Sequence, residues 1–111
     1  MNWMQTKTEE TWVVKIYLSG PISVAEQVCR EECLRKGLCV TIEPTLYIYT
    51  GGEERGFVVG LLNYPRFPTS PEDIAERAED LAIKLLDRTC QHSALIVTPK
   101  MTKWITVRED K

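Results

Sequence analysis

The sequence lacks most of the motifs that point to a particular activity. It has a single histidine, no C-x-x-C pair, and neither a G-x-G-x-x-G nor a Walker A pattern. Common zinc sites and the standard dinucleotide and P-loop sites are therefore disfavoured. A basic excess is also missing, because 14 Lys and Arg stand against 16 Asp and Glu and give a net charge of −2. Proteins that bind nucleic acid usually carry a net positive charge, so we expect no nucleic-acid partner.

No apolar run approaches the length needed to span a membrane. The first ten residues are polar, with Glu9 and Glu10 where a signal peptide would be apolar. These features predict a cytoplasmic protein without a membrane partner. A chain of 111 residues with 43% hydrophobic residues suits one folded unit. We expect a flexible N-terminal segment over residues 1–11 and a single domain over 12–111.

The four cysteines are interpreted as reduced and buried, because free cysteine is among the most buried residue types. They are Cys29, Cys33, Cys39 and Cys90. Without a secretion signal, a disulfide framework is disfavoured. A zinc site that includes Cys90 and His92 is the alternative, but their spacing is not typical of zinc ligands. We therefore predict neither a metal nor a cofactor.

The first third of the chain predicts a strand followed by a helix. Apolar residues alternate over residues 12–18, which is typical of a half-buried or central strand. Ser23 and Glu26 have the spacing of a capping box and place the start of a helix at Ser23. Gly37 is a natural end for it. The helix would have an apolar stripe formed by Ala25, Val28, Cys29 and Cys33.

The middle of the chain predicts a β-hairpin. Residues 38–50 are β-rich but contain Glu43-Pro44, which indicates a bulge, an edge strand or two abutting strands. A turn is expected over residues 51–54, and a strand over 56–63. Because residues 57–62 are apolar at nearly every position, we expect this strand to be buried on both faces.

The second helix has the clearest signals in the chain. Ser70 is a capping residue, Pro71 occupies the first helical position, and Glu72 and Asp73 favour the positive end of the helix. One continuous apolar face is predicted from Ile74, Ala78, Leu81, Ala82, Leu85 and Leu86. A core strand follows at 94–98, and the alternation over 102–108 predicts an extra strand or an arm.

The order strand, helix, strand, strand, helix, strand is the split βαβ pattern of ferredoxin-like domains. We therefore predict an α+β fold in which both helices cover one face of an antiparallel sheet, with a possible extra C-terminal strand. The other face would expose Val13, Tyr17, Tyr47 and Tyr49, which is a large apolar patch for a monomer. We accordingly expect a homo-oligomer.

The candidate ligand site combines a turn with aromatic and basic residues. Ser19-Gly20-Pro21 lies between a strand and a helix, where backbone N–H groups can hold an anion, although a plain turn would have the same residues. The aromatic residues near the hairpin suit stacking on a ligand, and equally an oligomer contact. The predicted ligand-binding residues are Lys15, Ser19, Gly20, Tyr47, Tyr49, Arg55 and Arg66.

The run Lys36-Gly-Leu-Cys-Val-Thr-Ile-Glu-Pro44, followed by Tyr47, Tyr49 and Gly51-Gly52, resembles the CutA family and more distantly the P-II nitrogen-regulatory proteins. That family has a comparable cysteine- and proline-containing run, a tyrosine-rich strand and a glycine turn in the same order. The resemblance implies a ferredoxin-like subunit that forms trimers by edge-strand pairing, with clefts between subunits. It implies no metal site and no defined ligand.

These observations favour a non-enzymatic oligomeric protein that senses or sequesters a small anionic or nucleotide-like ligand in clefts between subunits. One alternative is a small ferredoxin-like enzyme that uses His92 as an acid or base. Another is a protein–protein interaction module. The enzyme is less favoured because no nucleophile–base pair is evident and a histidine at a helix end often caps it.

Overall fold

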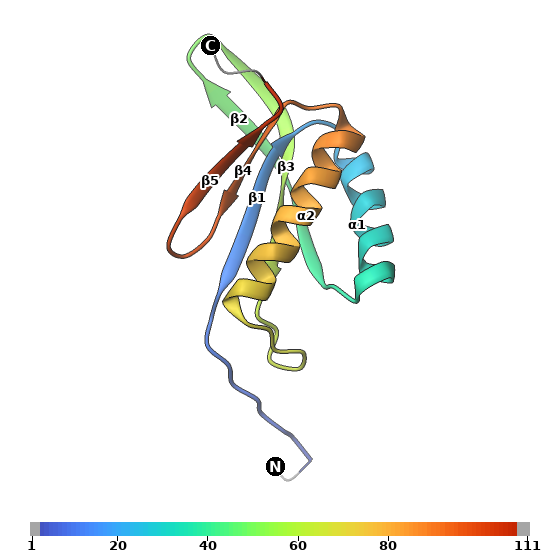
Figure 1. The fold of residues 1–111 in the computed structure, drawn as a ribbon, viewed down its shortest axis with the longest axis vertical. Coiled ribbons are helices and arrows are strands. Elements are labelled where there is room, and N and C mark those ends of the chain that lie inside the picture. The colour runs from blue at the N-terminus through green and yellow to red at the C-terminus, as the bar shows by residue number, and fades with distance from the viewer. Residues whose placement is uncertain (1–2, 109–111) are drawn as a thin grey trace.

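The computed structural model describes residues 3–108 as one sheet and two helices (Figure 1). The elements are β1 (Val13–Ser19), α1 (Ile22–Lys36), β2 (Val40–Tyr49), β3 (Gly52–Leu62), α2 (Pro71–Thr89), β4 (Ser93–Val97) and β5 (Thr102–Thr106). The strand order is β2-β3-β1-β4-β5, and every neighbouring pair is antiparallel. The first four strands have the ferredoxin-like arrangement, and β5 extends the sheet beyond β4. This confirms the predicted fold, including the extra C-terminal strand.

Both helices lie on the same face of the sheet (Figure 1). The central strands β1 and β3 alternate, so that every second side chain points into the layer between sheet and helices. In β1 these are Val14, Ile16 and Leu18, which pair with Leu61, Val59 and Phe57 of β3. The core is therefore one-sided, and the opposite sheet face has no helix over it.

The second helix follows its sequence signals closely. The Ser70 hydroxyl accepts a hydrogen bond of 3.1 Å from the backbone N–H of Asp73, and Pro71 is the first helical residue. The predicted apolar face is buried at every position: Ile74, Ala78, Leu81, Ala82, Leu85 and Leu86. The capping residue, the proline and the apolar face all depend on residues within the helix or next to it, which is why the sequence predicts this helix so well.

The first helix begins differently from the prediction. Its first residue is Ile22, the capping position is Pro21, and no side chain caps it, so the capping box at Ser23 and Glu26 is wrong. The carbonyl of Pro21 instead accepts bonds from the N–H groups of Val24 and Ala25. The helix ends as predicted, with Gly37 in the left-handed region at φ 68°.

The hairpin of β2 and β3 is longer than predicted. β2 runs through Pro44 without a break, and it is an edge strand, which is where a sheet tolerates proline. The turn is Thr50-Gly51 rather than residues 51–54, and β3 begins at Gly52 rather than Gly56. Because β1 pairs with β3 only as far as Gly56, residues 45–55 project beyond the sheet as a hairpin arm.

Burial departs from the prediction in two places. β3 is not buried on both faces, because Leu62 on the face without helices is 46% exposed, although Val58 on that face is covered. Of the four cysteines, only Cys29 is buried; Cys33 is half-buried, and Cys39 and Cys90 are exposed. Cys39 lies in the loop before β2 and Cys90 just past the end of α2, where little packs over them.

Candidate functional site

The sheet face opposite the helices is apolar along one row that crosses four strands. The strand register places Val58, Tyr17, Leu95 and Trp104 side by side on β3, β1, β4 and β5. Trp104, at the edge of the sheet, is 60% exposed. Val58 is covered and Tyr17 and Leu95 are half-buried, so Trp104 contributes most of the exposed apolar surface of this row.

A shallow hollow of about 300 Å³ lies at this row, and we call it the open-face hollow. It takes its walls from β1, β2, β4 and β5, with both aromatic and small polar side chains. Ser93 donates a hydrogen bond of 2.8 Å to the hydroxyl of Thr106 beside it. The residues that line the hollow are Tyr17, Leu18, Ser19, Tyr47, Ser93, Ala94, Leu95 and Trp104.

Tyr47 fixes the hairpin arm to the edge of this hollow. Its hydroxyl donates to the carbonyl oxygen of Phe57 at 2.8 Å and accepts from the backbone N–H of Leu18 at 3.1 Å. Burial raises the pKa of Tyr47, so the hydroxyl stays protonated and acts as a structural donor rather than as a base. A side chain at Gly56 would collide with the Leu18 carbonyl and with the Tyr47 ring, which explains why glycine is needed there.

The structure brings together four of the seven predicted ligand-binding residues. Ser19 and Tyr47 line the open-face hollow, and the N–H of Gly20 donates to the carbonyl of Arg55 at 3.2 Å. Gly20 has φ 122°, a conformation that other residues rarely adopt. The strand-to-helix turn and the hairpin arm therefore meet at one end of the sheet.

The other three predicted residues lie elsewhere. Lys15 is exposed on the open face, where it pairs with Gly60 and Val97. Tyr49 lies on the hairpin arm, and its hydroxyl donates to the Glu54 carboxylate at 3.2 Å. This hydrogen bond raises the pKa of Tyr49.

Arg66 lies at the opposite end of the sheet, in the loop after β3, over the ring of Phe67. Within one subunit Arg66 therefore lies far from the hairpin tyrosines, and its contact with the same ligand in a cleft between subunits stays a prediction.

His92 is exposed and does not line the open-face hollow. It also does not cap α2, because the backbone N–H groups of Cys90 and Gln91 bond to the last carbonyls of the helix. The predicted capping role of His92 is thus wrong, and its neighbour Ser93 is the residue that reaches the hollow.

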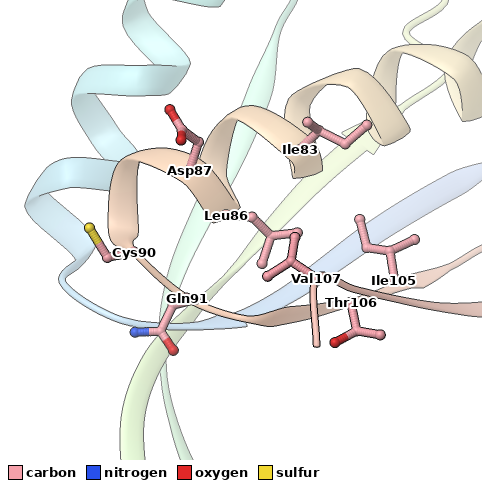
Figure 2. A pocket seen from close by; sticks show the side chains of 8 residues that line it. All are labelled: Ile83, Leu86, Asp87, Cys90, Gln91, Ile105, Thr106 and Val107. Atoms are coloured by element: carbon pink, nitrogen blue, oxygen red, sulfur yellow. The ribbon is translucent and has the colours of Figure 1, made fainter. Parts of the chain in front are cut away.

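A larger hollow, of about 530 Å³, opens on the helical side between the end of α2 and β5 (Figure 2). Its walls are mainly aliphatic, with Asp87 as the single charged side chain. No predicted ligand-binding residue lines it. We favour the smaller open-face hollow as the functional site because aromatic and hydroxyl groups from four strands converge there.

The sequence did not single out Ser93, Leu95 or Trp104 as site residues. The alternation of residues 102–108 was the available signal, because a fifth strand beside β4 places Trp104 on the open face. Among residues 3–108, no three His, Cys, Asp or Glu side chains converge in a way that could hold a metal ion. Neither helix of the described chain is both long and apolar enough to cross a membrane.

The sheet order and the two helices define a ferredoxin-like α+β protein. No family model and no curated protein matches the chain. The fold is similar to a phage SAM lyase in its apo state, with a TM-score of 0.72 and 14% identity over 97% of this chain and 99% of that one. It is also similar to a phage SAM lyase in complex with S-methyl-5'-thioadenosine, with a TM-score of 0.64 and 13% identity over 97% and 98% of the two chains.

These comparisons correct the functional prediction. The sequence favoured a non-enzymatic binding protein, whereas both similar structures are of an enzyme. The similarity to an enzyme contradicts that prediction and gives better support to the alternative of a small ferredoxin-like enzyme. Neither comparison bears on the resemblance to the CutA and P-II families, which stays a prediction.

Proposed function

We propose that this chain is an enzyme that cleaves S-adenosylmethionine and releases S-methyl-5'-thioadenosine. The observation that carries the proposal is the similarity to the phage SAM lyase over nearly the full length of both chains. Identity of 14% supports a common fold, and the assignment of the activity needs the open-face hollow as well. The walls of that hollow suit this substrate.

The reaction requires cleavage of the bond between the sulfonium sulfur and the γ-carbon of the methionine portion of the substrate. The electron pair of this bond moves to sulfur, which becomes a neutral thioether. The four-carbon fragment that remains either closes onto its own carboxylate or loses a proton. In the first case no external base is needed, and the substrate supplies its own nucleophile.

The open-face hollow offers groups for binding and orientation rather than for proton transfer. Tyr17 and Trp104 present aromatic rings, which attract cations such as a sulfonium and stack on bases such as adenine. Ser19 and Ser93 add hydroxyl groups that can hold polar atoms of the substrate. None of the four is a carboxylate, an amine or a guanidinium. If a second subunit covers this shallow hollow and excludes water, the site favours a step in which a cation and a carboxylate neutralise each other.

We further propose that the active form is a homo-oligomer, and a trimer as the resemblance to CutA implies. The row of Val58, Tyr17, Leu95 and Trp104 has no helix over it, and the hairpin arm exposes Ile48 at 75%. Packing of open faces would bury this surface and deepen the hollow into a cleft between subunits. Lys15, Tyr49 and Arg55 would then contact the substrate or a neighbouring subunit. A cytoplasmic location fits a substrate that cells keep inside.

The experiment is a direct assay of the purified chain with S-adenosylmethionine. Mass spectrometry should detect S-methyl-5'-thioadenosine at a rate above that of the spontaneous reaction. The proton NMR spectrum of the four-carbon product distinguishes the two routes, because only loss of a proton leaves a carbon–carbon double bond with its olefinic protons, whereas closure onto the carboxylate gives a saturated ring. Absence of S-methyl-5'-thioadenosine at substrate saturation would contradict the proposal. Light scattering of the same sample gives the oligomeric state.

A further inference from the structure

The chain that precedes β1 is anchored to the body of the domain at one point. Asn63, which is 4% exposed, donates from its side chain to the carbonyl of Glu10 at 2.8 Å and from its backbone to the carbonyl of Trp12 at 3.0 Å. The indole N–H of Trp12 donates to the carbonyl of Thr69 at 3.4 Å. These contacts fix the direction in which the preceding residues leave the domain.

Residues 3–10, which we call the N-terminal arm, extend away from the body along its long axis (Figure 1). The molecule measures 59 × 28 × 28 Å. An extended chain advances about 3.3 Å per residue, so the arm spans roughly 25 Å. Trp3 is 75% exposed and Met4 60%. The segment from Trp3 to Trp12 contains no glycine or proline, the residues that most readily turn a chain back on itself.

An apolar groove of about 340 Å³ lies beside the root of the arm. Thr69, the residue to which Trp12 bonds, is part of its wall. Tyr64 and Phe67 stack with their ring centroids 6.1 Å apart, and Phe67 is 64% exposed. The other apolar walls are Leu38, Leu61, Leu62 and Ile74. An exposed aromatic groove next to an exposed indole is a complementary pair. Gln5 and Lys7 of the arm lie against the loop that carries Tyr64, but Trp3 does not line its own groove and stays 75% exposed.

The sequence of the arm is complementary to itself when two copies run antiparallel. With Thr8 opposite Thr8, each Lys7 faces a Glu9 of the other copy, so two opposite-charge pairs form. The same register puts Met4 opposite Trp12 and brings Trp3 level with the start of β1. Each Trp3 then reaches the end of the other domain at which the groove opens. A contact of this kind is two-fold symmetric and closed.

We propose that the N-terminal arms of two copies pair antiparallel, and that each places Trp3 in the Tyr64–Phe67 groove of the other copy. The occupant of the groove is thus a second copy of this chain. The contact uses the end of the domain away from the turn at Ser19 and Gly20, and it does not depend on the proposed lyase activity.

The test measures the mass of the full chain by sedimentation velocity across micromolar concentrations. Trp3→Ala should halve the assembled mass relative to the unaltered chain, and Phe67→Ala should do the same from the receiving side. Met101→Ala is the control for loss of an exposed apolar side chain, because Met101 lies in the turn between β4 and β5 and is 70% exposed, and this variant should leave the assembled mass unchanged. Far-UV circular dichroism confirms folding, since Trp3 and Phe67 are exposed.

A charge exchange tests the register. Lys7→Glu should weaken the two-fold assembly at least tenfold, and Lys7→Glu with Glu9→Lys should restore it. An unchanged assembled mass for Trp3→Ala would overturn the proposal. If this substitution alters tryptophan emission while the mass stays the same, the arm folds onto its own domain, and the proposal is again contradicted. Failure of the exchanged pair to restore assembly would also contradict the antiparallel register.

Discussion

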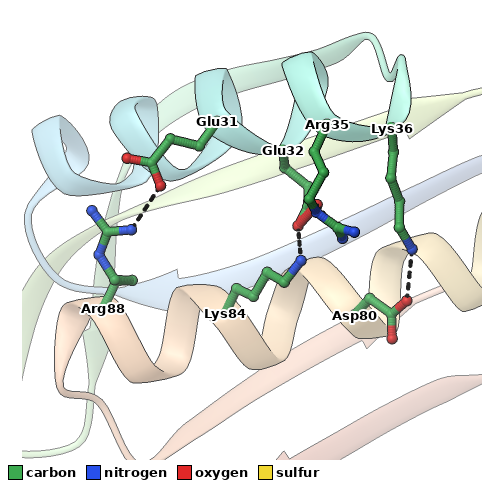
Figure 3. A network of polar contacts seen from close by, with 7 residues as sticks. All are labelled: Glu31, Glu32, Arg35, Lys36, Asp80, Lys84 and Arg88. Carbon is green, nitrogen blue, oxygen red and sulfur yellow. Dashed lines mark hydrogen bonds and ion pairs between the residues drawn. The ribbon is translucent and has the colours of Figure 1, made fainter.

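Glu32 of α1 is buried between the helices and is held by Lys84 of α2. Its carboxylate accepts from the Lys84 ammonium and from the Arg35 guanidinium, the latter at 2.7 Å, and it is 4% exposed. Figure 3 shows this pair between two more exposed ion pairs that also join the helices. A buried carboxylate needs such partners, because an unpaired charge in the interior is strongly unfavourable. The stripe predicted for α1 did not include Glu32.

We expect Glu32→Gln to lower the free energy of unfolding by about 1–2 kcal/mol, because a neutral amide loses charge-assisted bonds and keeps the shape. Urea unfolding at pH 7 measures the effect. Glu31→Gln is the matched control, since its carboxylate bonds to Arg88 at the solvent-exposed surface and should change stability much less. Equal losses for the two variants would contradict the importance of burial.

The same carboxylate gives stability a pH dependence. Burial would raise the pKa of Glu32, but hydrogen bonds from Lys84 and Arg35 outweigh it and the pKa is lowered. A lowered pKa in the folded state means that the stabilisation is complete above the unfolded pKa, and is lost as pH falls through the folded value. The difference in Tm between the unaltered chain and Glu32→Gln should therefore shrink below about pH 4. A difference that grows in acid would contradict this assignment.

The sequence predicts features formed by residues close together in the chain well, and sites formed by residues far apart in the chain poorly. The cap at Ser70 and the apolar stripe of α2 lie within a few turns of one another, and both are confirmed. The open-face hollow joins β1, β2, β4 and β5, so no short pattern contains it. The tyrosine-rich strand was recognised, but Trp104 joins Tyr17 only through the register of the fourth and fifth strands.

Gly56 tests how firmly the hairpin arm is held. An added methyl group would collide with the Leu18 carbonyl and would lie 2.7 Å from the Tyr47 ring. We expect Gly56→Ala to cost about 1–3 kcal/mol, as for other overpacked sites. Gly60→Ala is the control, because its methyl group would meet mainly the hydroxyl of Thr41, which can rotate away. Thermal unfolding compares them, and equal losses would argue against a rigid contact at Gly56.

The four thiols should differ in reactivity. Burial, chiefly, raises the pKa of Cys29 to about 12, whereas Cys39 and Cys90 are exposed. Because the thiolate is the reactive form, we expect iodoacetamide to modify Cys39 and Cys90 first and Cys29 only after unfolding. Peptide mass mapping over a time course measures the order. Early modification of Cys29 in the folded chain would show that α1 does not pack as described.

The proposed active site is tested most sharply by Trp104. Its side chain is 60% exposed, so Trp104→Ala should change Tm little while removing an aromatic wall of the hollow. We expect kcat/KM for S-adenosylmethionine to fall at least tenfold, which corresponds to about 1.4 kcal/mol of lost transition-state binding. His92→Ala is the matched control, because His92 is equally a surface residue near β4 but lies outside the hollow. If His92→Ala abolishes turnover while Trp104→Ala retains it, the reaction uses histidine as its acid or base and the site lies elsewhere. If Trp104→Ala alone loses activity, binding and orientation in the open-face hollow account for catalysis.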